Sequence, residues 1–105
     1  MRRASRYHGV TVNAVGFRYS PVMQFAYTYV LKLADGEWYV GSTDDLKRRL
    51  KEHGNGECDA TKNRRPVELI YFEGCRSIEA ARDREKQLKT GYGRGYLRKR
   101  LAHTL

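Results

Sequence analysis

The chain has 105 residues, of which 31% are charged and 11% are aromatic, and its formal net charge is +9. This length fits one domain with a modest hydrophobic core and excludes a two-domain architecture. No apolar run is long enough to span a membrane, and the basic N-terminus lacks the apolar core of a secretion signal, so we expect a cytoplasmic protein without membrane contact.

The positive charge is concentrated at the two ends of the chain. Residues 1–24 hold four arginines and no acid, residues 86–105 hold six lysines and arginines and no acid, and residues 25–85 hold eleven bases against twelve acids. Each phosphate that a basic residue neutralises releases counterions, so this distribution favours a polyanionic partner. The alternative is that the charge only keeps two frayed ends soluble.

Residues 1–22 show no sustained hydrophobic period. We interpret residues 1–24 as a flexible basic extension and place the folded domain at residues 25–105. Cys58 and Cys75 form no Cys-x-x-Cys pair, so neither a zinc site nor a disulfide framework is indicated.

An antiparallel hairpin is predicted at the start of the folded domain. Residues 25–33 alternate in the manner of a strand, and the Asp-Gly pair at residues 35–36 favours a tight turn. Residues 37–41 then return as the second strand. We therefore expect Tyr29 and Tyr39 on neighbouring strands.

A helix is predicted from Thr43 to His53. Gly41 lets the backbone leave the strand, and Ser42 with Asp45 has the spacing of a capping box. Gly54 ends the helix.

One face of this helix combines apolar and polar residues. Leu46 and Leu50 lie four residues apart and form its apolar stripe, and Arg49 and His53 border that stripe. Polar groups at an inward rim suggest a lined pocket. The alternative is that both are solvated, with His53 capping the carbonyls at the helix end.

The third predicted strand covers residues 67–72 and is the most apolar of the three. It follows a polar loop at residues 54–66 that ends in Pro66, which keeps its predecessor out of the helical conformation. Its apolar composition predicts the centre of the sheet.

A second helix is predicted at residues 78–90, with Ser77 as its N-cap. Glu85 shares one helical face with Ala81 and Leu88. Burying an unpaired carboxylate is costly, so Glu85 must face a cation, a hydrogen-bond network or an open cleft. An intramolecular salt bridge is the structural alternative. Gly91 is expected to end this helix, and residues 93–101 form a last basic helix.

These polar residues are suited to phosphodiester hydrolysis. A divalent metal held by Glu85 can neutralise phosphate charge, Arg49 can bind the phosphate oxygens, and Tyr29 or Tyr39 can take a proton from the attacking water. One carboxylate suits a single ion such as Mg²⁺ or Mn²⁺ that keeps most of its waters. Tyrosine has a reference pKa of about 10, and lowering it to about 7 costs roughly 4 kcal/mol. Arg49, His53 and the metal are the available sources of that energy.

Five segments also resemble, in order, the motifs of the GIY-YIG nuclease superfamily. They are residues 27–29 (Tyr-Thr-Tyr, in place of Gly-Ile-Tyr), 39–41 (Tyr-Val-Gly), 45–53, 61–69 and 84–91. The resemblance covers residues 25–101. It implies an α+β (α/β) domain, with a small three-stranded sheet flanked by helices, and metal-dependent cleavage of DNA.

By this resemblance the chain looks like the small stand-alone members and like the N-terminal nuclease domain of excinucleases. Tyr29 and Tyr39 would be the two motif tyrosines and Arg49 the phosphate-binding arginine. His53 would accept or relay a proton, and Glu85 would bind the metal. Some members add a late asparagine to the site, and this sequence has no asparagine after Glu85.

Basic residues outside the catalytic set are candidates for contacting the DNA backbone. They are Lys62, Arg64 and Arg65 in the loop, and Arg94, Arg98, Lys99 and Arg100 in the last helix. For the loop residues the alternatives are a solvated surface or a structural pair with an acid.

We therefore expect a Mg²⁺- or Mn²⁺-dependent endonuclease, a monomer or weak dimer. It would read DNA structure, branched or single-stranded, in repair or recombination, with RNA left open as a substrate. The first alternative is a non-catalytic nucleic-acid-binding module of the same fold. The second is a protein-interaction domain whose basic ends meet an acidic partner.

Overall fold

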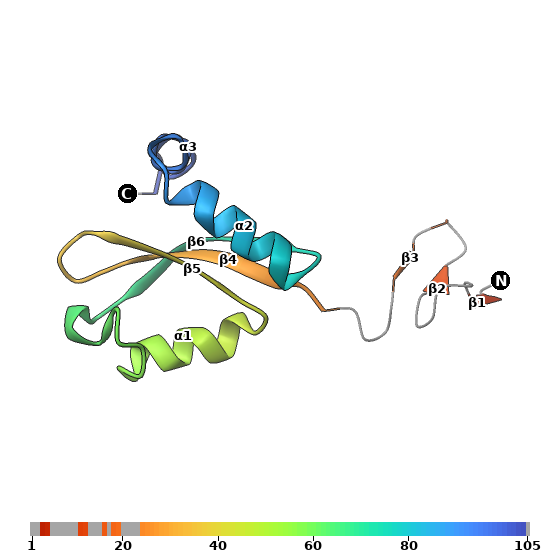
Figure 1. Cartoon of the computed structure of the whole chain (residues 1–105), viewed down its shortest axis with the longest axis horizontal. Coiled ribbons are helices and arrows are strands. Elements are labelled where there is room, and N and C mark those ends of the chain that lie inside the picture. Colours follow the sequence, from red (N-terminus) through yellow and green to blue (C-terminus); the bar gives the residue numbers. More distant parts are fainter. Residues whose placement is uncertain (1–2, 5–10, 13–15, 17, 20–23, 105) are drawn as a thin grey trace.

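The computed structural model describes residues 3–4, 11–12, 16, 18–19 and 24–104. In chain order its elements are β1 (Arg3–Ala4), β2 (Thr11–Val12), β3 (Arg18–Tyr19), β4 (Ala26–Lys32), β5 (Trp38–Thr43), α1 (Leu46–Gly54), the short 3-10 helix η1 (Lys62–Arg64), β6 (Glu68–Cys75), α2 (Ile78–Leu88) and α3 (Gly91–Arg100). The fold from β4 onward is the expected α+β arrangement, with α1 on one side of a three-stranded sheet and α2 with α3 on the other (Figure 1).

The first three strands are two residues long each and pair antiparallel with one another in the order β1-β2-β3. The predicted flexibility of residues 1–24 concerns a stretch that lies mostly outside the described residues, and it stays a prediction. Within the described part of the chain, no helix is long and apolar enough to cross a membrane.

The strand at the centre of the main sheet is β4, and not the strand at residues 67–72. The order is β5-β4-β6, and both neighbours run antiparallel to β4. The prediction failed because it took the most apolar strand as the central one, whereas β4 contains polar Thr28. Thr28 is buried and donates a hydrogen bond to the Ala81 carbonyl of α2 over 2.7 Å, so packing of the helix satisfies this polar group. Apolar β6 is an edge strand that leaves Phe72 52% exposed.

The predicted hairpin is confirmed. Tyr29 pairs with Gly41 and Leu31 pairs with Tyr39 across β4 and β5. The turn contains Gly36 at φ +86°, a left-handed backbone conformation that glycine adopts without steric cost. The two tyrosines therefore lie on neighbouring strands, as expected.

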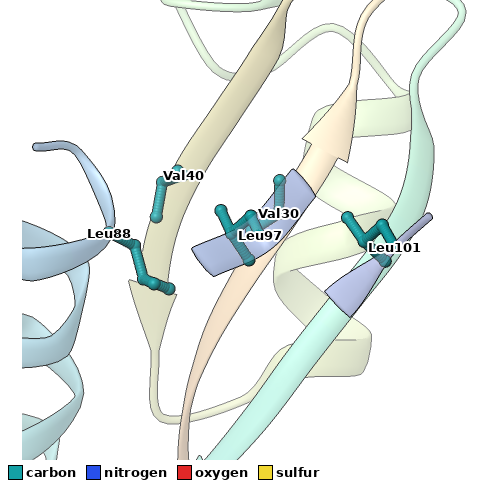
Figure 2. Packing of buried hydrophobic residues seen from close by; sticks show 5 residues of the cluster. All are labelled: Val30, Val40, Leu88, Leu97 and Leu101. Carbon is teal, nitrogen blue, oxygen red and sulfur yellow. The ribbon is translucent and has the colours of Figure 1, made fainter. Parts of the chain in front are cut away.

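Each face of β4 is covered by its own hydrophobic cluster. On one face the buried residues are Val30, Val40, Leu88, Leu97 and Leu101, which join the sheet to α2 and α3 (Figure 2). On the other face Tyr29, Leu31 and Leu33 pack against residues that include Leu46 and Leu50 of α1. Burying apolar area on both faces stabilises the position of the central strand relative to all three helices.

The N-terminus of α1 differs from the prediction. The helix begins at Leu46, and the side chain of Asp45 accepts a hydrogen bond from the Arg48 backbone N–H over 3.1 Å. Ser42, predicted as a partner of Asp45 in the cap, is still part of β5. Aspartate is a strong N-cap by itself, so the serine is free for another contact.

The N-cap of α2 is confirmed, because Ser77 accepts from the Ala80 backbone N–H. The prediction that Gly91 ends this helix is wrong: α2 ends at Leu88, and Gly91 is the first residue of α3. Thr90 accepts from the Gly93 backbone N–H and caps α3. A threonine oxygen at this position starts a new helix before the glycines can act as terminators.

A bidentate ion pair ties α2 to β6. The guanidinium of Arg84 donates to both carboxylate oxygens of Glu73, at 2.9 and 3.0 Å, and lies 4.9 Å above the ring of Tyr96 in α3. Burial would raise the pKa of Glu73, but hydrogen bonds from Arg84 and Tyr71 outweigh it and lower that pKa. Arg84 therefore holds α2, the helix that carries Glu85, against β6.

Candidate functional site

Four of the five predicted catalytic residues lie together on the α1 face of the sheet. Tyr29 comes from β4, Tyr39 from β5, and Arg49 and His53 from α1. The two tyrosine rings are 6.4 Å apart, and the His53 ring lies 5.6 Å from Tyr29 and 5.3 Å from Tyr39. Helical spacing predicted that Arg49 and His53 share one rim of the helix, and the hairpin predicted that the tyrosines are on neighbouring strands; their roles stay a prediction.

His53 is the centre of a buried hydrogen-bonded chain. Its Nε2 atom is 2.8 Å from the Tyr29 hydroxyl, and its Nδ1 atom is 2.8 Å from the Thr61 hydroxyl. Each of the three residues is at most 1% exposed. Burial, followed by the positive charge of Arg49, lowers the pKa of His53, so the ring is neutral at pH 7. A neutral ring has one donor and one acceptor nitrogen, and two hydroxyls satisfy both.

Burial makes Tyr29 a poor proton acceptor. Desolvation raises the pKa of its hydroxyl to about 12, and the adjacent Arg49 guanidinium offsets only part of this. Of the sources named for lowering a tyrosine pKa toward 7, the Arg49 guanidinium therefore does not achieve it at Tyr29. Gly41 explains the close packing, since a Cβ atom at that position would lie 2.5 Å from the Tyr29 hydroxyl oxygen.

Tyr39 is in a different environment. It is half-buried, and its hydroxyl makes no hydrogen bond to any residue in the described part of the chain. Arg49 donates to Glu52 over 3.0 Å and stays 36% exposed. A hydrogen bond with Tyr29 raises the pKa of Arg49, which keeps its charge. The Tyr39 hydroxyl and the Arg49 guanidinium are therefore both available to contact a phosphate group.

Glu85 lies on the opposite face of β5. Its Oε1 accepts from Ser42 Oγ and its Oε2 accepts from Lys89 Nζ, both at 2.6 Å. Burial acts to raise the pKa of Glu85, but these two donors lower it, so the side chain is an anion. The predicted core position is half-buried with 23% of the side chain exposed, and the salt-bridge alternative is realised through Lys89.

Glu85 and the tyrosine–histidine cluster lie on opposite faces of β5, which is an edge strand of the sheet. Successive residues of a strand point to opposite faces, so Gly41, beneath Tyr29, and Ser42, bonded to Glu85, are adjacent in sequence but face different sides. Because β5 is an edge strand, no further strand separates them from solvent among the described residues. A ligand can therefore reach both sides only by passing around this edge.

The residues at Glu85 fit one divalent ion held through a single carboxylate. The side chain is ionised and reaches solvent, whereas the described residues contain no cluster of three or more His, Cys, Asp or Glu that could enclose a metal. Mg²⁺ commonly binds one or two carboxylates and completes its shell with water and phosphate oxygens. Ser42 would then orient the carboxylate.

A groove of about 570 Å³ runs along the same edge, between β5 and α3. Its cationic side chains are Arg64, Lys89, Arg94 and Arg98, against one acid, Glu37. Trp38 and Tyr39 also line it. Arg94 and Arg98 make no ion pair with any residue that the structure describes. Three of the basic residues predicted to contact DNA are thus brought together beside the candidate base.

The other predicted DNA-contacting residues of the loop have local partners. Lys62 pairs with Asp59 at 3.3 Å. Arg65 donates to the carbonyls of Lys62 and Gly54, which caps the C-terminal end of α1. The structure gives these two residues a structural role and does not place them in the groove.

Sequence reasoning missed Ser42, Thr61, Lys89 and Trp38. Only Lys89 had a readable signal, because a lysine four residues after a glutamate on a helix is a common ion pair. Ser42 and Thr61 reach the site through strand pairing and loop packing, which local sequence patterns do not encode.

The architecture defines a small α+β domain with a polar site at the free edge of its sheet. A family model described as the GIY-YIG catalytic domain matches residues 25–99, and the chain belongs to this family.

The chain is also similar to several UPF0213 proteins. A UPF0213 protein of Streptococcus pneumoniae is 46% identical over 65 residues, which are 61% of this chain and 66% of that protein. UPF0213 protein HQ_3675A of Haloquadratum walsbyi is 37% identical over 67 residues, covering 63% and 75%. The chain therefore spans just under two thirds of the first of these. A solution NMR structure of UPF0213 protein BH0048 from Bacillus halodurans has 30% identity, coverage of 76% and 88%, and a TM-score of 0.49.

Proposed function

We propose that the chain is a divalent-metal-dependent endonuclease that hydrolyses DNA phosphodiester bonds. Membership of the GIY-YIG family supports nuclease-type chemistry. The observation that carries the proposal is the cation-lined groove beside β5, which is lined by Tyr39 and by Lys89, the ion-pair partner of Glu85. We further propose that it reads DNA structure in repair or recombination, inside the cytoplasm.

The residues divide the work of hydrolysis according to their exposure. Tyr39, whose hydroxyl is free, first loses its own proton to solvent and then, as the phenolate, takes the proton from the attacking water. Arg49 binds the non-bridging oxygens of the scissile phosphate and stabilises the charge that develops on them. Glu85 would hold a divalent ion, Mg²⁺ or Mn²⁺, which would supply Lewis-acid stabilisation of the leaving oxygen. Tyr29 and His53 stay aligned through the buried hydrogen-bonded chain that ends at Thr61.

The groove cations hold the nucleic-acid backbone next to this site. Arg94 and Arg98 have no ion-pair partner among the described residues, so their charge is available to phosphates. Arg64 is 2.7 Å from Asp35, which fixes its guanidinium at the mouth of the groove. Backbone contacts of this kind select the shape of a strand more than its sequence.

One observation favours a second candidate, a nucleic-acid-binding module without turnover. Both carboxylate oxygens of Glu85 already have protein donors. If that pair never opens, the groove binds DNA and no hydrolysis follows.

Cleavage of a panel of DNA substrates distinguishes the two candidates. Plain duplex, flapped, branched and single-stranded DNA, and a matched RNA, are incubated with Mg²⁺, with Mn²⁺ and with EDTA. We expect metal-dependent cleavage with a preference for flapped, branched or single-stranded DNA. Binding by every preparation without cleavage of any substrate would favour the binding module.

A further inference from the structure

The two hydrogen-bond donors to the Glu85 carboxylate, Ser42 and Lys89, differ in their exposure to solvent. Ser42 holds Oε1 from within β5, where its side chain is half-buried. Lys89 holds Oε2 from solvent, with 53% of its side chain exposed. The serine contact is part of the fold, whereas the lysine contact depends on a long, mobile side chain.

Lys89 also lines the cationic groove, together with Arg94 and Arg98. Its ammonium therefore stands between two possible anions, the Glu85 carboxylate and a phosphate in the groove. An exposed i,i+4 ion pair contributes little to stability, so exchanging one anion for the other costs little. The Lys89 ammonium also occupies Oε2 of Glu85, which a divalent ion would need, and its positive charge repels such an ion.

We propose that Lys89 masks Glu85 from divalent metal ions until a nucleic-acid phosphate enters the groove and takes over the ammonium. This inference rests on the proposed function and adds a regulating residue to it. Metal at Glu85 and phosphate at Lys89 then favour each other's binding, because each releases the partner that the other needs. The protein avoids holding a charged catalytic ion when no substrate is bound.

The first test measures Mn²⁺ binding without nucleic acid, by electron paramagnetic resonance of the free ion. Lys89→Met removes the competing ammonium and should raise the affinity about tenfold. Lys86→Met is the matched control, because Lys86 is exposed on the same helix and should change the affinity less than about twofold. Glu85→Gln should abolish the binding.

The second test measures oligonucleotide binding in EDTA through the fluorescence of Trp38, which is the single tryptophan of the chain and lines the groove. Glu85→Gln frees Lys89 and should increase the affinity for the oligonucleotide. The increase should be several-fold larger than that of the control Glu79→Gln, which removes the same charge from the same helix. Adding Lys89→Met to Glu85→Gln should cancel that extra gain.

The outcomes separate the inference from the proposed function. If Glu85→Gln abolishes Mn²⁺ binding while Lys89→Met and Lys86→Met behave alike, the masking role is overturned and the metal site stands. If Glu85→Gln binds Mn²⁺ as the parent protein does, the metal site itself is wrong, and the masking role is overturned with it. An equal gain from Glu85→Gln and Glu79→Gln in oligonucleotide binding would also contradict the inference.

Discussion

The two faces of β5 hold polar groups in opposite states. On the α1 face, Tyr29, His53 and Thr61 form a chain that is at most 1% exposed and fully hydrogen-bonded. On the α2 face, Glu85 and Lys89 are 23% and 53% exposed. Buried, satisfied groups rigidify a structure, whereas accessible ones can exchange partners. We therefore propose that the buried chain positions the site and that the accessible groups at the edge of β5 bind and react.

The largest effect expected from this contrast concerns Glu85. Glu85→Gln keeps the side-chain volume and removes the charge that would hold the metal, so the cleavage rate should fall by at least about 10³-fold. A single-turnover assay in Mn²⁺ measures the loss. A thermal midpoint close to that of the parent protein would show that the Glu85 carboxylate acts in catalysis and is not needed for stability. If the variant still cleaves DNA, Glu85 has no role in the mechanism.

The two tyrosines differ most clearly in what their hydroxyls do. Tyr39→Phe removes the accessible hydroxyl and should slow cleavage by about 10²-fold or more, with stability within about 0.5 kcal/mol of the parent. Tyr29→Phe leaves the Nε2 atom of buried His53 without its partner and should cost about 1–3 kcal/mol in the free energy of unfolding. Urea denaturation and single-turnover rates measure both. The reverse assignment, with Tyr29→Phe stable and inactive and Tyr39→Phe active, would make the buried phenol the base.

The groove arginines should affect binding and leave the fold intact. Changing both Arg94 and Arg98 to Gln should weaken oligonucleotide binding about tenfold and reduce the slope of log K against log salt by about 2. The matched control changes exposed Lys47 and Lys51 of α1 to Gln, which alters the net charge equally. Equal losses in the two double variants would show that total charge, and not the groove, governs binding.

The smallest expected effect is a pH dependence that originates in the buried chain. The pKa of His53 is lowered in the folded state from 6.5, so below that pH the unfolded chain binds a proton more readily than the folded one. His53 therefore contributes stability that is present above pH 6.5 and is lost as the pH falls. Urea denaturation at several pH values, compared with His53→Gln, measures this contribution; parallel curves for both proteins would contradict it.

Tyr29 and His53 of the buried chain could be predicted as site residues from the sequence, whereas Thr61 and the contact of Ser42 with Glu85 could not. Asp35-Gly36 predicted the hairpin, and the spacing of Arg49 and His53 predicted that both border the inward-facing stripe of α1, where the His53 ring meets the two tyrosines. The central strand was predicted wrongly because polar Thr28 made β4 look less suited to burial than β6. Its hydroxyl donates to the carbonyl of Ala81, which is distant in sequence, and the sequence does not show this contact.

The environment of Glu85 shows where sequence reasoning ends. Its helical face predicted that the carboxylate needs a partner, and i,i+4 spacing makes Lys89 a candidate. Ser42 reaches the same carboxylate from a strand 43 positions away, and only the packing of α2 on β5 brings them together. Burial similarly raises the pKa of Tyr29, and a local sequence pattern does not show how deeply this hydroxyl is buried.

A crystal structure of the Tyr39→Phe variant with Mn²⁺ and a short oligonucleotide would show whether the edge of β5 is the reacting site, because anomalous scattering locates the ion. We expect an ion on the Glu85 carboxylate, Lys89 turned toward the nucleic acid, and a phosphate between Glu85 and residue 39. An ion bound elsewhere, with Lys89 still on Glu85 while the oligonucleotide fills the groove, would show that this edge does not carry the chemistry.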